Sequence, residues 1–270
     1  MSKIHATALI DLKAQLASGV EVGPYSVIGP HVKIGKDTRI AGHVTIDGHT
    51  ELGERCAVYS YACLGTTPQV RRPPVKSYLK VGDDNTIREY VTMNPGMHEE
   101  GATVVGSKNF LMMNVHVAHD CRLGDQVTVA NGVALAGHVL VEDHATIGGL
   151  SGVHQYVRIG RYAMIGGLSK AVTDIPPFST CNGNPASFYG INVLGLKRAG
   201  FDSSERLLIR KVLKNLLASG KRLSAAIAET EKEFPSDAHI KTILDFLKNS
   251  KRGVVRARSI LREDEEVHAG

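Results

Sequence analysis

The sequence predicts a parallel β-helix, a solenoid of short strands in six-residue repeats, followed by a small α-helical domain. An aliphatic residue recurs every six positions in two long runs, and the repeat stops near residue 190. The segment after it shows the i, i+3, i+4 apolar spacing of amphipathic helices. With 270 residues and 43% hydrophobic content, the chain can bury a long core and a smaller second unit.

The six-residue repeat is the strongest signal in the chain. One run steps from Ile4 to Leu64, a second from Val105 to Ile165, and a short run of three positions begins at Val81. At a 43% hydrophobic base rate, the 22 hits of the long runs would arise by chance about once in 10⁸ trials. A period of six fits neither a helix nor a long strand, so it predicts short strands joined by tight corners, three to a coil.

Glycine often follows the aliphatic position, as at Gly23, Gly35 and Gly124. We expect these glycines to supply the unusual backbone angles of the corners. Successive coils should then pair at about 4.8 Å, with the aliphatic positions stacked inside. Residues 66–80 and 94–104 break the phase, which predicts two loops that leave the prism.

Helical patterns begin where the hexads end. We therefore expect the β-helix over residues 1–190 and the helical domain over residues 191–270. Asp202 and Glu205 have the spacing of a capping box, and the apolar periodicity that follows ends at Gly220. Further helices are predicted over about 224–234 and 237–250, and the tail at 262–270 should be frayed.

Charge is unevenly distributed along the chain. From residue 192 onward there are 16 Lys/Arg against 11 Asp/Glu, whereas the first 191 residues carry 16 of each. The basic part could attract nucleic acid, a membrane surface or an acidic protein, or it could be a solvated helix face. Four scattered cysteines without a CxxC pair, and no apolar run in the first fifteen residues, favour a soluble cytoplasmic protein.

The repeat phase gathers histidines on one surface. Residues 18 apart share a face, so His119 should lie over Gly137 and beside His138, with Asp120 next to it. Five histidines fall within residues 116–154. They could be ordinary surface side chains, a zinc site, or a general base with an orienting carboxylate and an oxyanion donor.

Several longer strings carry a family resemblance that covers about residues 3–255. The strings are "NTIREYVT" (85–92), "NVHVAHDC" (114–121), "LAGHV" (135–139), "GVHQY" (152–156), "GNPA" (183–186) and "GINVLGLKRAGF" (190–201). With them the chain resembles the UDP-N-acetylglucosamine 3-O-acyltransferase family of lipid A biosynthesis, whose members are left-handed hexapeptide-repeat β-helices. The handedness comes from this resemblance alone, because the usual crossover rule favours the opposite hand.

The resemblance implies a role for each matching residue. His119 corresponds to the general base that activates the sugar 3-hydroxyl, Asp120 to its orienting carboxylate, and Gly137 to the backbone donor facing the oxyanion. Gly166 and Gly167 lie where family members set acyl-chain length, so we expect a groove open to longer chains. The implied substrate-binding residues are His116, His138, His154, Gln155, Asn192 and Arg198.

The resemblance also implies partners. The family is a homotrimer with clefts between neighbouring chains, and its acyl donor is acyl carrier protein. It uses no metal, cofactor or covalent enzyme intermediate, and neither nucleic acid nor membrane insertion is implied. The acidic carrier gives the basic segment a partner. The residues expected to bind it are Arg206, Arg210, Lys211 and Lys214.

Three positions depart from the family pattern. Val70 stands where the family has an acidic residue after "PQ", Asn94 replaces a histidine, and Leu194 replaces a glutamate near the nucleotide. All three fall on substrate-binding positions, so a related acceptor such as a 3-amino sugar nucleotide stays open. A zinc enzyme similar to γ-carbonic anhydrase and a noncatalytic solenoid are the alternatives from other classes.

Overall fold

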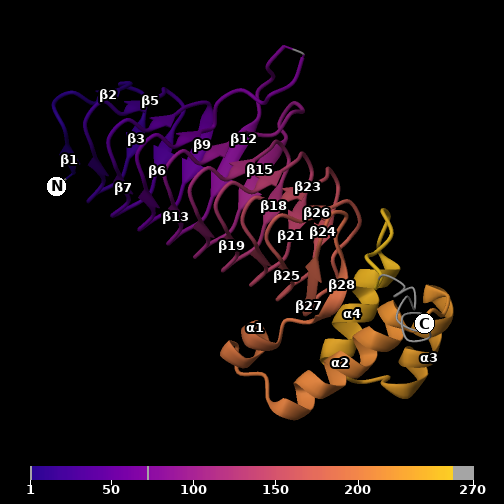
Figure 1. The fold of residues 1–270 in the computed structure, drawn as a ribbon. Coiled ribbons are helices and arrows are strands. Elements are labelled where there is room, and N and C mark those ends of the chain that lie inside the picture. Colours follow the sequence, from indigo (N-terminus) through magenta and orange to yellow (C-terminus); the bar gives the residue numbers. More distant parts are fainter. Residues whose placement is uncertain (1, 72, 258–270) are drawn as a thin grey trace, which may run out of the picture.

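The chain folds into a three-sided, left-handed parallel β-helix with four helices at its C-terminal end (Figure 1). The computed structural model describes residues 2–71 and 73–257. Successive coils of the prism pair through parallel strands, and in unbroken coils the register advances by 18 residues, as from Lys3 to Glu21. The predicted fold class is confirmed.

The strands form three sheets, one for each side of the prism. Sheet A contains β1 (Lys3–Ile4), β4 (Glu21–Val22), β7 (Arg39–Ile40), β10 (Ala57–Val58), β13 (Thr86–Ile87), β16 (Phe110–Leu111), β19 (Thr128–Val129), β22 (Thr146–Ile147), β25 (Met164–Ile165), β27 (Ser179–Asn182) and β28 (Ser187–Ile191). Sheet B contains β2 (Leu9–Ile10), β5 (Val27–Ile28), β8 (Thr45–Ile46), β11 (Cys63–Leu64), β14 (Thr92–Met93), β17 (His116–Val117), β20 (Ala134–Leu135), β23 (Gly152–Val153) and β26 (Lys170–Ala171). Sheet C contains β3 (Gln15–Leu16), β6 (Lys33–Ile34), β9 (His49–Leu52), β12 (Tyr78–Val81), β15 (Ala102–Val105), β18 (Arg122–Leu123), β21 (Leu140–Val141) and β24 (Arg158–Ile159).

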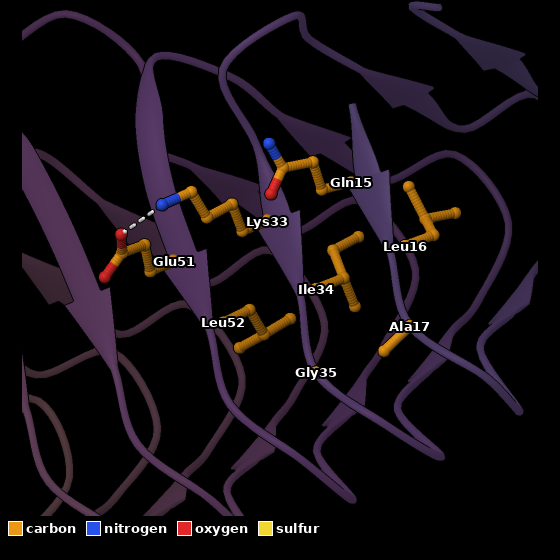
Figure 2. Close-up of a pocket in the computed structure, with 8 residues that line it drawn as sticks. All are labelled: Gln15, Leu16, Ala17, Lys33, Ile34, Gly35, Glu51 and Leu52. Atoms are coloured by element: carbon orange, nitrogen blue, oxygen red, sulfur yellow. Dashed lines mark hydrogen bonds and ion pairs between the residues drawn. The ribbon is translucent and has the colours of Figure 1, made fainter. Parts of the chain in front are cut away.

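The two residues of a short strand divide between core and surface. On sheet C, Ile34 and Leu52 are buried, whereas their neighbours Lys33 and Glu51 face outward and form an ion pair at 3.1 Å (Figure 2). A depression of about 540 Å³ lies over these strands, but this exposed pair is its only charged feature. Exposed pairs contribute little to stability. We therefore do not take this depression as the candidate functional site.

The corners require a correction to the expected role of glycine. The left-handed backbone conformation occurs three positions after the aliphatic residue, mostly on non-glycine residues such as Tyr25 and Asp37. Apart from Gly65 at the start of the first insertion (φ 77°), the described glycines directly after the aliphatic residue, such as Gly35, do not adopt positive φ. A Cβ at Gly35 would instead lie 2.5 Å from the carbonyl carbon of Gly53. These glycines allow neighbouring coils to approach closely; they do not supply the corner angle.

Two insertions leave the prism without disturbing its register. Residues 65–77 separate β11 from β12, and residues 94–101 separate β14 from β15. After each insertion the strand pairs again with its neighbour, His49 with Tyr78 and Tyr78 with Ala102. The coils on either side therefore stay aligned. The first insertion projects from the prism in Figure 1.

The helices lie beyond the last coil, next to the antiparallel pair β27–β28 (Figure 1). They are α1 (Val193–Arg198), α2 (Ser203–Ala218), α3 (Leu223–Glu233) and α4 (Ala238–Lys248). The predicted capping box at Asp202 and Glu205 is confirmed, and α2, α3 and α4 match the three expected helices. The short α1, capped by Asn192, was not predicted. The tail expected to be frayed at 262–270 lies outside the described residues.

Membrane insertion was not expected from the sequence. Among the residues that the structure describes, we find no helix with the length and hydrophobicity needed to cross a bilayer.

The close spacing of the coils predicts how a methyl group added at a corner glycine changes the stability of the fold. Gly35→Ala should lower the free energy of unfolding by about 1–3 kcal/mol, because its Cβ meets the backbone of the next coil. Gly190→Ala is the matched control, since a Cβ there has no atom within 4 Å and should change stability by less than about 0.5 kcal/mol. Urea titrations at one protein concentration measure both. Equal midpoints for the two variants would contradict the close-approach explanation.

Candidate active site

The candidate site lies at the corner where the chain passes from sheet B to sheet C. β17 ends at Val117, and His119 and Asp120 follow after Ala118; Asp120 takes the left-handed corner position with φ 59°. The imidazole of His119 lies over Gly137, where a Cβ would come within 2.4 Å of its Cε1 atom. The 18-residue phase predicted this neighbour. Any side chain at position 137 would displace His119.

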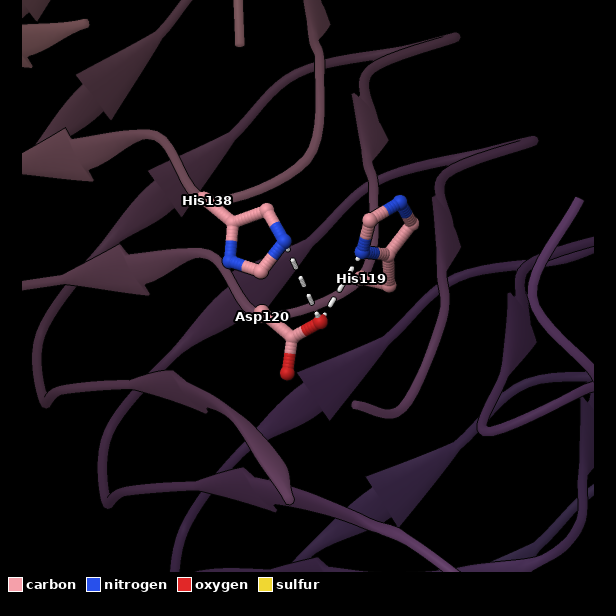
Figure 3. Close-up of side chains that lie close together, drawn as sticks. All are labelled: His119, Asp120 and His138. Carbon is pink, nitrogen blue, oxygen red and sulfur yellow. Dashed lines mark hydrogen bonds and ion pairs between the residues drawn. The ribbon is translucent and has the colours of Figure 1, made fainter. Parts of the chain in front are cut away.

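One carboxylate oxygen organises the corner. Oδ2 of Asp120 lies 2.9 Å from Nδ1 of His119 and 3.7 Å from Nε2 of His138, and both rings point toward it (Figure 3). The same oxygen accepts a hydrogen bond from the backbone N–H of Met97 at 3.1 Å. Met97 belongs to the second insertion, so this loop helps to hold the carboxylate in place.

His138 is held from its other side. Its ring stacks on Tyr156, one coil further, with centroids 4.6 Å apart and an interplanar angle of 8°. Burial lowers its pKa, although the charge of Asp120 acts in the opposite direction. Its Nε2 is buried and makes no hydrogen bond within the described residues. The Asp120 carboxylate, 3.7 Å from this nitrogen, is too far away for a hydrogen bond.

A groove of about 480 Å³ runs from this corner across sheet B. Its floor is mostly apolar, and no aspartate or glutamate of the described chain lines it. His116 stands on one strand of the floor with Nδ1 2.7 Å from Oγ1 of Thr92. Burial and then the neighbouring His119 lower the pKa of His116. The lining residues are Gln69, Asn94, His116, Ala118, His119, Ala134, Leu135, Ala136, Gly137, Gly152, Val153, His154 and Lys170.

The structure brings together part of the predicted substrate-binding set. His116, His119, Gly137 and His154 line the groove, and His138 contacts the corner through Asp120. Gln155 is exposed next to His154, and its backbone carbonyl oxygen lies 3.3 Å from Nδ1 of His154. His144, the fifth clustered histidine, stacks on Tyr162 at a different corner.

Asn192 and Arg198 lie away from this groove in the single chain. Both ends of the Asn192 carboxamide are used locally: Nδ2 donates to the carbonyl of Tyr162 at 2.9 Å, and Oδ1 accepts from the N–H of Gly195 at 3.0 Å. Arg198 is exposed at the last turn of α1. Within one chain, Asn192 is a helix cap.

Gly166 and Gly167 occupy the corner between sheets A and B, and neither lines the groove. A Cβ at Gly166 would lie 2.7 Å from Oδ1 of Asn182, so any side chain there would require the Asn182 carboxamide to move. Gly167 is exposed.

Sequence reasoning missed two polar residues that line the groove. Gln69 stands in the "TPQ" string of the first insertion, and Lys170 belongs to β26, three coils after His116. Counting 18-residue steps from His116 would have found Lys170. Asn94 lines the groove and also donates from Nδ2 to the carbonyls of Thr66 and Thr67, at 3.0 and 3.3 Å. It therefore ties the two insertions together as well as facing the groove.

The basic residues of α2 differ in whether another group of the chain pairs with their charge. Lys211 pairs with Glu233 at 2.6 Å, and Arg206 donates to the carbonyl of Phe201. Arg210 and Lys214 are exposed four residues apart and have no ion-pair partner within the described residues. The free positive charge of this helix lies on those two side chains.

Metal binding has to be weighed at the same corner. One ligand atom from each of His119, Asp120 and His138 lies within 4.8 Å of the others, close enough to share an ion. The Nδ1 atom of His119, however, already contacts the carboxylate oxygen, as in a base with its orienting acid. Metal content of the purified protein distinguishes the two arrangements.

A left-handed β-helix of hexads with this groove defines a hexapeptide-repeat transferase, and the "Bacterial transferase hexapeptide" model matches residues 13–48 and 102–137. The model described as "Udp N-acetylglucosamine O-acyltransferase; Domain 2" matches residues 174–255. The acyl-[acyl-carrier-protein]–UDP-N-acetylglucosamine O-acyltransferase of Herminiimonas arsenicoxydans is 45% identical over 262 residues, covering 95% of this chain and all of that one. The chain belongs to the UDP-N-acetylglucosamine O-acyltransferase family.

Solved structures agree with this assignment. The Francisella novicida UDP-N-acetylglucosamine acyltransferase superposes with a TM-score of 0.91 at 34% identity and covers 95% of each chain. The Arabidopsis enzyme of the same name has a TM-score of 0.83 at 30% identity, covering 94% of this chain and all of that one.

The buried histidines predict loss of stability in acid. Because burial lowers the pKa of His116 in the folded protein, the unfolded chain binds more protons once the pH drops below the usual imidazole value of about 6.5. Stability should be full above that value and fall as the pH passes through the lowered folded-state pKa. Calorimetric melting temperatures from about pH 8 to pH 5 measure the slope.

His116→Asn should make this slope shallower, and substitution of the exposed His5 by Asn should not. A slope unchanged in the His116 variant would show that other groups cause the acid sensitivity.

Proposed function

We propose that the protein transfers a 3-hydroxyacyl chain from acyl carrier protein to the 3-hydroxyl of UDP-N-acetylglucosamine, the first step of lipid A biosynthesis. The names of its relatives support the substrates. The 2.9 Å contact between Nδ1 of His119 and Asp120 is the observation that carries the mechanism. A carboxylate on Nδ1 holds a proton there and leaves the Nε2 lone pair for the substrate.

In the proposed reaction, His119 is the general base. Nε2 takes the proton of the sugar hydroxyl while its oxygen attacks the thioester carbonyl. The carbon–sulfur bond of the resulting tetrahedral intermediate then breaks, and the imidazolium returns the proton to the leaving thiolate. Asp120 stabilises the imidazolium during these steps. No covalent enzyme intermediate, metal or cofactor takes part.

The developing oxyanion needs a donor near His119. We assign this role to the backbone N–H of Gly137, which makes no hydrogen bond within the described chain. N–H groups at the same position of other corners are also free, as at Gly149, so the proximity of His119 distinguishes this one. His116, His138, His154 and Gln155 would contact the sugar and the reacting groups.

We infer a cytoplasmic homotrimer with the active cleft between neighbouring chains. This accounts for Asn192 and Arg198, which lie outside the groove of their own chain and would serve a neighbour's cleft. Acyl carrier protein is acidic, so the exposed charges of α2 would guide it to the cleft. Gly166 and Gly167 would leave the path for a long acyl chain free of side chains.

A second acceptor is favoured by one observation. Asn94, where the family has histidine, lines the groove and holds the first insertion, which carries Val70 and Gln69. These changes beside the sugar site suit a related nucleotide sugar, such as a 3-amino analogue that would give an amide. Mass spectrometry of the product from mixed acceptors and donors identifies the sugar, the linkage and the chain length. Amide product alone would replace the first proposal with the second.

His119→Ala should reduce kcat/KM by about 10²–10⁴-fold, because the hydroxyl loses its base. His144→Ala is the control: this histidine stacks on Tyr162 at another corner, outside the groove, and its loss should leave turnover unchanged. Initial rates with purified carrier and nucleotide sugar measure both. Full activity in His119→Ala, or activity that depends on bound zinc, would remove the mechanism.

Reversing both free charges of α2, by Arg210→Glu with Lys214→Glu, should raise KM for the acyl carrier about tenfold at low salt and leave KM for the nucleotide sugar unchanged. The control is Lys13→Glu, an exposed reversal on the first coil, far from the helices (Figure 1). If the double variant keeps the wild-type KM for the carrier in low salt, the carrier docks elsewhere.

A further inference from the structure

The floor of the groove is a register-aligned row on sheet B. His116 pairs with Ala134, Ala134 with Gly152, and Gly152 with Lys170. All four line the groove. Neighbouring strands are about 4.8 Å apart, so His116 and Lys170 stand roughly 14 Å apart along the row. Between them the row carries no side chain larger than a methyl group, which leaves an open trough.

The fold does not require glycine at position 152. Its φ lies outside the left-handed region, and a Cβ would have no atom within 4 Å. Gly148, on the preceding corner, differs: a Cβ there would meet the backbone nitrogen of Gly167 at 2.5 Å. Glycine in a strand costs stability relative to a residue with a side chain. The empty space above Gly152 is therefore available for a ligand and is not needed for packing.

Lys170 closes the far end of the trough with a free positive charge. Its backbone is fixed, because its N–H donates to Gly183 at 3.0 Å and its carbonyl accepts from Ala186 at 2.8 Å, both in the "GNPA" string. Its side chain is exposed and has no ion-pair partner in the described part of the chain. With no carboxylate among the lining residues, the trough favours an anion.

We propose that the trough over Gly152, ending at Lys170, is a subsite for a phosphate group of a substrate. The proposal rests on the proposed function, in which both substrates carry phosphate: the nucleotide sugar as a diphosphate, and the carrier as the phosphodiester of its pantetheine arm. Lysine serves such groups as a point charge. His119 lies over Gly137, whose coil is two coils before that of Lys170. A phosphate beside the Lys170 ammonium and a hydroxyl beside His119 would therefore occupy different positions along the same trough.

The first test removes the charge. Lys170→Ala should raise KM about tenfold or more for the substrate whose phosphate is bound, with kcat changed less than about twofold, since a charge-assisted hydrogen bond is lost. Lys170→Arg should restore most of the affinity. A raised KM for UDP-N-acetylglucosamine identifies the diphosphate, and a raised KM for the acyl carrier identifies the pantetheine phosphodiester. Unchanged KM values for both at low salt would overturn the proposal.

The second test fills the space. Gly152→Val should fold with an equal or higher melting temperature, because valine favours strands and meets no atom within 4 Å, yet it should raise the same KM as Lys170→Ala. Wild-type affinity in this stable variant would show that the trough is empty during catalysis. UDP binding by calorimetry to wild type and Lys170→Ala gives a readout independent of turnover. These outcomes can be distinguished from a failure of the proposed function. If that function is wrong, the wild-type protein itself transfers no acyl chain.

Discussion

Adjacent coils hydrogen-bond through their backbones along the whole prism, so each residue of an unbroken coil lies one strand spacing from the residue 18 positions earlier. At that distance, a side chain fits at a corner only where the backbone of the neighbouring coil leaves room for it. This excludes a side chain at positions such as Gly35, and it stacks rings on one another where a corner residue projects, as in Tyr25, His43 and Tyr61. Core, corners and surface rows all follow from this spacing.

The candidate active site depends on the same constraint. His119 can lie flat against the next coil only because Gly137 has no side chain, and His138 is held by the ring of Tyr156 one coil further. The left-handed corner places the carboxylate of Asp120 between the two imidazoles. The backbone register thus fixes the imidazole and the carboxylate with little dependence on flexible side chains, and the proposed general-base mechanism requires such positioning.

Much of this could be predicted because the repeat converts sequence separation into distance. The six-residue phase gave the fold, the breaks at the two insertions and the contact of His119 with Gly137. It could not show that Asn192 would cap α1 away from the groove, because the chain leaves the repeat before that residue. It also could not show why Gly35 is glycine, since close backbone approach is a property of two coils together. Gln69 was missed because its loop follows no period.

The two insertions begin and end at strands that pair as if nothing intervened. Their length and composition can therefore change during evolution without shifting the coil that carries His119. The contact of the second insertion with Asp120 uses the backbone N–H of Met97, a group that every residue except proline has. Substitutions in the insertions, such as Asn94, can then accumulate while the corner of His119 and Asp120 keeps its geometry. A lineage built on this scaffold can change the lining of the groove by changing loops alone.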